Sequence, residues 1–158
     1  MGSRSFAISL MLLAPCSSIG PAAASDDPAS YCASVGTDDR VRPITSGLVA
    51  PAIRLFELQS GQAQWVKDST VYRCMRGSVW LCNHGANLVC AKADTRTALP
   101  SVTAYCKQNP NEEFVPMVVT GHGVNHSWGC VNGKARVKET VDLDERGFIA
   151  NQWKRFAP

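Results

Sequence analysis

Two apolar segments, each reversed at a glycine, dominate the pattern along this chain. The first lies in residues 71–90, where a run of strand-forming side chains breaks at Arg76-Gly77 and resumes at Val79. The second joins residues 128–131 to residues 134–143 through Asn132-Gly133. Asn-Gly between apolar runs is the strongest short hairpin signal. The sequence therefore predicts two β-hairpins.

The turn of the first hairpin fixes its register. With Arg76 and Gly77 as the central pair, Cys74 lies opposite Val79 and Cys82 lies opposite Val71. Facing alternates along a strand, so Cys74 and Cys82 lie on opposite faces of the hairpin. We therefore expect each of these cysteines to pair elsewhere.

Helical spacing appears twice. The first helix follows a cap at Ser46 and ends before Gly61, and the second covers residues 100–108 after Thr97. The apolar face of the first helix consists of Leu48, Val49, Ala52, Ile53 and Phe56.

The remaining segments predict an extended arm over residues 25–43 that is pinned at Cys32, a loop over residues 83–87 and a buried strand over residues 114–120. Residues 144–147 form a turn, and residues 148–156 fit a strand or a helix equally well. Together these elements predict an α+β fold: a small, disulfide-stapled antiparallel sheet of about four to six strands with one or two helices on one face.

The two hairpins open alike. Residues 72–77 and residues 128–133 both read aromatic, any, Cys, any, any, Gly. Such a short match fits either a coincidence between ordinary hairpins or an internal duplication.

The first 24 residues have the pattern of a secretory signal peptide. Arg4 precedes the apolar stretch 6–13, which is too short to span a bilayer, and three alanines end at Ala24. Two rival patterns fit less well, because Pro15 precedes Cys16 in a lipoprotein-like box and Phe6 replaces the Ser or Thr of a myristoylation start. We expect a secreted or periplasmic protein whose single mature domain covers residues 25–158, with no membrane span.

Removal of the signal leaves six cysteines: Cys32, Cys74, Cys82, Cys90, Cys106 and Cys130. An even number of cysteines in an exported protein predicts disulfides. Spacing leaves the connectivity open, and Cys90 with Cys106 is our first guess at one pair. The net charge falls from +3 to +2 because Arg4 leaves, and no basic cluster indicates nucleic acid.

Several of these segments, which together span most of the mature chain, resemble a group of small exported bacterial proteins that has no assigned activity. The matching segments are Cys32, residues 72–90 with Gly85-Ala86-Asn87, residues 119–122, residues 128–130 and residues 146–148. The opening Tyr72-x-Cys74-x-x-Gly77 also resembles the first strand of MliC-type lysozyme inhibitors, but the later inhibitory loop of that family has no counterpart in this chain. The resemblances therefore carry over a sequence pattern but no activity or mechanism.

The chemistry-bearing residues give two function hypotheses. No nucleophile elbow or phosphate-binding loop is present in the sequence, and the cysteines are consumed by disulfides. The preferred hypothesis is a binding or inhibitory module with His122 as a partner contact. Its unknown partner is expected to be an envelope or extracellular protein. The alternative is a hydrolase that uses His122 or His84 with a carboxylate, and a purely structural envelope protein is a third option.

His122 and His126 form an H-x-x-x-H pair that invites comparison with zinc sites. Such a pair chelates zinc on a helix, but Gly121 and Gly123 disfavour a helix here. In an extended strand the two residues lie about 13 Å apart. We therefore expect no metal and no other cofactor.

The signal-peptide pattern makes a direct prediction. The exported protein begins at Ser25, because Ala22 and Ala24 supply the small residues that signal peptidase requires. Intact-mass analysis of secreted protein checks this, and a lipidated species that begins at Cys16 contradicts it.

Overall fold

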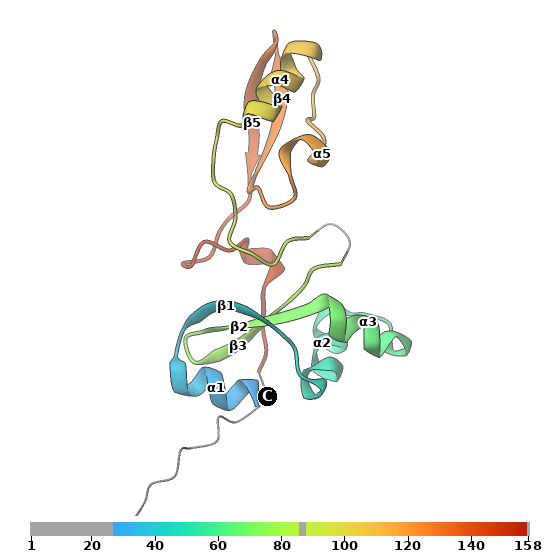
Figure 1. Cartoon of the computed structure of the whole chain (residues 1–158), viewed down its shortest axis with the longest axis vertical. Helices are drawn as coiled ribbons and strands as arrows, with labels where there is room; N and C mark the ends of the chain where they lie inside the picture. Colours follow the sequence, from blue (N-terminus) through green and yellow to red (C-terminus); the bar gives the residue numbers. More distant parts are fainter. Residues whose placement is uncertain (1–26, 86–87, 158) are drawn as a thin grey trace, which may run out of the picture.

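The computed structural model describes residues 27–85 and 88–157, so the predicted signal peptide, the predicted start at Ser25 and the Ala86-Asn87 step lie outside the described residues. The fold is α+β, as the sequence predicted. Its strands form two antiparallel sheets, a four-stranded one in the order β1-β2-β3-β6 and a two-stranded one, β4-β5. Figure 1 shows these sheets in two lobes at opposite ends of an elongated molecule, with loops between them.

The first lobe contains most of the elements. They are α1 (Pro28–Val35), β1 (Asp38–Pro43), η1 (Ser46–Leu48), α2 (Val49–Phe56), η2 (Ser60–Gln62), α3 (Ala63–Ser69), β2 (Thr70–Met75) and β3 (Ser78–Asn83). The C-terminal elements η3 (Ala150–Gln152) and β6 (Lys154–Arg155) return to this lobe. The second lobe contains α4 (Pro100–Gln108), α5 (Met117–Thr120), β4 (His126–Val131) and β5 (Lys134–Thr140).

The predicted register of the first hairpin is confirmed. Cys74 pairs with Val79 and Val71 pairs with Cys82. Arg76 has a φ of 52°, and the following glycine has a φ of 72°. Two successive positive φ angles are typical of a type I′ turn, whose twist matches that of the strands.

Helices cover one face of the four-stranded sheet. Residues of α1, α2 and α3 pack with side chains of β2 and β3 around the buried Cys74, Val79 and Leu81. The predicted extended arm is therefore wrong over α1. The Asp27 carboxylate accepts hydrogen bonds from the backbone N–H groups of Ala29 and Ser30, and Pro28 occupies the first turn. These are strong helix-start signals.

Two further segments differ from their predictions. The helix expected between Ser46 and Gly61 ends earlier than predicted, because Glu57 ends α2 in the left-handed conformation, and the unpredicted helix α3 begins only after Gly61. The buried strand expected over residues 114–120 is wrong, because Pro116 caps the one-turn helix α5 and Gly121 ends it. The open choice for residues 148–156 resolves into the short elements η3 and β6.

Loops cover the other face of the first sheet. Phe148 and Trp153 from the C-terminal segment pack with Cys82, Cys90 and the partly buried Val71 and Trp80. The chain therefore leaves the first lobe after β3, builds the second lobe, and returns to cover the sheet it left.

The two lobes contain the same local unit, in which a disulfide joins a helix to the first strand of a hairpin. In the first disulfide unit, Cys32 of α1 bonds Cys74 of β2. The backbone N–H of Gly77 donates to the carbonyl oxygen of Gly36 at 2.7 Å, and that of Arg76 donates to the Thr37 hydroxyl oxygen at 3.2 Å. These bonds tie the turn to the chain that leaves the helix.

The second disulfide unit repeats each of these contacts. Cys106 of α4 bonds Cys130 of β4. The backbone N–H of Gly133 donates to Pro110 at 2.9 Å, and that of Asn132 donates to the Asn111 side-chain oxygen at 3.2 Å. The similar openings of the two hairpins therefore correspond to equivalent structures, which favours the duplication interpretation over coincidence.

The third disulfide, Cys82–Cys90, links β3 to the segment that follows it. Our guess of Cys90 with Cys106 is wrong, because each helix cysteine bonds the hairpin on which its own helix packs. The expectation that Cys74 and Cys82 pair elsewhere is confirmed.

Loop length predicts the order in which the disulfides stabilise the fold. The bonded cysteines are 42, 24 and 8 residues apart for Cys32–Cys74, Cys106–Cys130 and Cys82–Cys90. Replacing each pair by alanine lowers the free energy of unfolding by about 4, 3.5 and 2.6 kcal/mol respectively, since a longer loop restricts the unfolded chain more. Urea unfolding measures these losses, and a reversed order contradicts the prediction.

Candidate functional site

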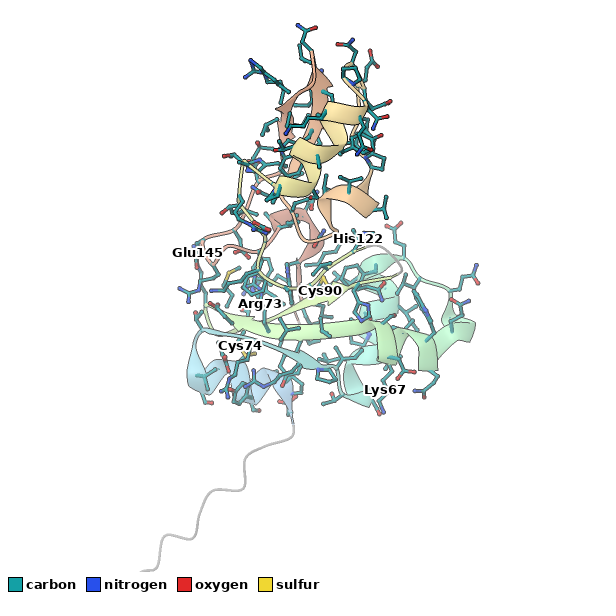
Figure 2. The ribbon with its side chains drawn as sticks, turned by 45° about the horizontal axis from the view of Figure 1, so that its top comes forward. Lys67, Arg73, Cys74, Cys90, His122 and Glu145 are labelled. Atoms are coloured by element: carbon teal, nitrogen blue, oxygen red, sulfur yellow. A yellow bond between two sulfur atoms is a disulfide. The ribbon has the colours of Figure 1, made fainter. Side chains whose placement is uncertain are left out.

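The candidate site lies where the two lobes meet, around His122. This histidine is exposed and follows α5, and Figure 2 shows it at the junction of the lobes. It lines a hollow of about 200 Å³ in the second lobe and a larger one of about 420 Å³ that reaches the first lobe. The residues that line both hollows are Met117, His122, Val124 and Val141, and we call the combined feature the His122 groove.

The groove is rimmed by exposed apolar side chains. The exposed fractions of these lining residues are 57% for Phe114, 42% for Met117, 48% for Leu88 and 42% for Val141. Val118, which follows Met117 on α5, lines neither hollow and is 90% exposed. Met117 and Val118 belong to the one-turn helix α5, which Pro116 starts and Gly121, with a φ of 86°, ends. A cluster of exposed apolar residues of this kind marks an interaction site more often than isolated ones do.

Asn125 fixes the floor of the smaller hollow. Its backbone N–H donates to the carbonyl oxygen of Asp94 at 3.2 Å, and its carbonyl oxygen accepts from the N–H of Val141 at 2.8 Å. Its side-chain nitrogen donates to Val141 as well, whereas its buried side-chain oxygen has no hydrogen-bond partner among the described residues. Asn125 thus joins three segments beneath the groove.

His126 is engaged inside the second lobe. Its Nε2 lies 3.2 Å from the carbonyl oxygen of Thr95, and its Nδ1 lies 2.9 Å from the hydroxyl oxygen of Thr140. Since a carbonyl only accepts, Nε2–H donates to it, and in the neutral ring Nδ1 accepts from the Thr140 hydroxyl. Both ring nitrogens are therefore occupied. In residues 27–85 and 88–157, no three His, Cys, Asp or Glu side chains are grouped so as to hold a metal ion.

The groove offers no carboxylate to His122. None of the described residues that line either hollow is an aspartate or a glutamate, and Lys154 is the charged residue among them. His84 lies just after β3, where its backbone bonds Ser69 and Leu88. Within the described part of the chain, neither His122 nor His84 is hydrogen-bonded to a carboxylate. The described residues thus bring neither histidine together with the carboxylate that the hydrolase alternative expected.

Three acidic side chains, those of Asp39, Asp144 and Glu145, lie around Arg73 instead. This arginine is fully buried on β2 and bonds Asp144, and its guanidinium carbon lies 4.1 Å from the Phe148 ring centre and 4.6 Å from that of Trp153. Burial lowers the pKa of Arg73, and the charge of Asp144 opposes that shift. The sequence analysis did not single out Arg73. Its position between Tyr72 and Cys74 in an apolar strand was nevertheless a signal of a buried, paired charge.

Exposed ion pairs extend this network. Asp39 contacts Arg146 at 2.9 Å and Lys92 at 2.8 Å, and the hydrogen bond from Arg146 is the main cause that lowers its pKa to about 2. Because this folded-state pKa lies below the unfolded value of about 3.9, the pairs stabilise the fold above about pH 4. Their contribution is lost as the pH falls toward 2. Glu145, which bonds Arg76, and His122 lie at opposite sides of the junction in Figure 2.

Arg73 and Arg76 both form ion pairs, but Arg73 is buried and Arg76 is exposed. Alanine variants of the two therefore make a matched comparison. Arg73→Ala removes a buried ion pair and its packing, so we expect it to lower the free energy of unfolding by about 3–5 kcal/mol. Arg76→Ala removes a pair whose arginine is 75% exposed, and we expect a loss below about 1 kcal/mol. Urea unfolding measures both, and equal losses contradict the difference.

Comparisons with known proteins leave the function to be inferred from this chain itself. No protein-family model, curated protein or solved structure matches the chain. Among the described helices, none combines the length and the apolar character needed to cross a membrane.

Proposed function

We propose that this chain is an exported binding or inhibitory module that docks a partner protein on the His122 groove. The observation that carries the proposal is the exposed apolar surface that Phe114 and Met117 form at the groove, together with the adjacent Val118 of α5. Apolar side chains at the centre of an interface supply much of the binding energy. His122 adds a polar contact at the centre of this surface.

The proposal of export rests on two independent features. The first 24 residues have the pattern of a signal peptide, and three disulfides are typical of oxidising compartments. We propose the periplasm or the cell exterior as the location and an envelope or extracellular protein as the partner.

The lack of a carboxylate around the groove favours binding over hydrolysis. A histidine acts as a general base most effectively when a carboxylate orients it. The described residues around His122 supply apolar surface in place of that carboxylate.

The test uses a photo-crosslinking amino acid at Val118, which is 90% exposed. The crosslinked partner is identified in extracts of the exported fraction and purified, and its Kd is measured by calorimetry. Val118→Asp and Met117→Asp are expected to raise this Kd about tenfold or more, because a charge must then be desolvated in the interface.

Val41→Asp is the control, because Val41 is 39% exposed on β1, away from the groove. We expect its Kd to match that of the unmodified protein. A partner whose Kd is the same for all three variants contradicts docking at the groove, and a turnover that His122→Ala abolishes supports the hydrolase instead.

A further inference from the structure

The two disulfide units differ at one edge. In the first unit, β3 is not the end of the sheet, because the C-terminal strand β6 pairs with it. In the second unit, β5 holds the equivalent position and forms one edge of the two-stranded sheet. The described chain thus adds a strand to one copy of the unit and leaves the other copy without it.

The way β6 binds shows which backbone groups such an edge offers. Leu81 pairs with Lys154, and the N–H of Phe156 donates to the carbonyl oxygen of Val79 at 2.9 Å. Val79 and Leu81 come two and four residues after the turn glycine Gly77. The residues at the same places after Gly133 are Ala135 and Val137.

The register of the second hairpin gives the same result. Asn132 and Gly133 have φ angles of 49° and 77°, typical of a two-residue type I′ turn, so the flanking Lys134 forms a hydrogen-bonded pair with Val131. Hydrogen-bonded and non-hydrogen-bonded pairs then alternate. Ala135 and Val137 therefore direct their N–H and C=O groups away from β4, toward the open edge.

The side chains of β5 indicate what fits this edge. Lys134, Arg136 and Lys138 are all exposed, and none of them has an ion-pair partner among the described residues. Opposite charges on neighbouring strands stabilise pairing, whereas like charges directly opposite each other destabilise it. A second copy that paired antiparallel about Val137 would place Arg136 opposite Lys138. An acidic strand meets no such repulsion.

We propose that the open edge of β5 binds an extended, acidic segment of a partner protein by antiparallel strand addition, as β6 adds to β3. Backbone hydrogen bonds to Ala135 and Val137 hold the segment, and Lys134 and Arg136 select its acidic side chains. This site lies on the second hairpin and does not depend on docking at the His122 groove.

The test uses the mature protein and a short synthetic peptide in which glutamate alternates with valine and threonine. We expect the peptide to bind and to slow hydrogen exchange at the backbone amides of Ala135 and Val137. The same peptide with alternate backbone amides methylated keeps its charge but cannot pair, so we expect no binding from it.

The charge requirement is tested with matched double variants. Lys134→Gln with Arg136→Gln is expected to raise the Kd for the acidic peptide about tenfold, because two cross-strand charge pairs are lost. Arg54→Gln with Lys107→Gln removes the same charge from exposed positions on α2 and α4 and is expected to leave the Kd unchanged.

Three results overturn the proposal. The first is no binding of the acidic peptide. The second is equal binding of the methylated peptide, with equal weakening in both double variants, which indicates general attraction of polyanions. The third is protection of the Ala135 and Val137 amides by self-association without peptide, which assigns the edge to a second copy of this chain.

Discussion

The buried guanidinium of Arg73 is the interaction on which the arrangement of the two lobes depends. A charged group without contact with water is tolerated only when it is paired and packed. The Sδ atom of Met75, on the same strand, accepts one hydrogen bond from Arg73 at 3.6 Å. The paired carboxylate and the two packed rings, of Asp144, Phe148 and Trp153, come from the C-terminal segment. One oxygen of Asp144 bonds Arg73, while the other accepts the backbone N–H groups of Arg146 and Phe148 and so shapes the turn that carries it. The same contact therefore covers the first sheet, anchors the returning chain and positions the second lobe, from which that chain comes.

The candidate surfaces arise because one structural unit occurs twice and is completed differently each time. The position that Arg73 holds on β2 is taken on β4 by Gly129, where a Cβ atom would lie only 2.6 Å from the carbonyl oxygen of Glu113. Residues 112–115 thus lie directly against β4 in the second unit, where the N–H of Val115 donates to Trp128 and the N–H of Cys130 donates to Glu112. In the first unit, the C-terminal chain covers the side chain of Arg73 instead. What remains uncovered is the apolar groove at the junction and the basic edge of β5. We propose both surfaces as recognition sites.

Elements encoded by local chemistry were predictable from the sequence. The two glycine turns predicted both hairpins and the register of the first one, and helical spacing predicted α4. Predictions failed where a single residue that starts or ends a helix outweighed the general preference of the surrounding segment. Asp27 and Pro28 start a helix in a segment that seemed extended, and Pro116 and Gly121 turn a Val-rich run into the exposed turn α5. The disulfide pairing, the burial of Arg73 by residues about 70 positions later and the His122 groove depend on long-range packing, and no local pattern contains that information. His122 was identified from the sequence, but its apolar surroundings were not.

The central claim is that the contact between Arg73 and the C-terminal segment holds the two disulfide units in one relative position. Electron spin resonance measures this directly, with spin labels placed through unnatural amino acids at the exposed Val41 of the first lobe and Val131 of the second. We expect one narrow distance distribution in the unmodified protein. The Asp144→Ala variant keeps all three disulfides, and we expect its distance distribution to be broad. The measurement is made under conditions in which this variant remains folded. An equally narrow distribution at the same distance in the variant would contradict the claim.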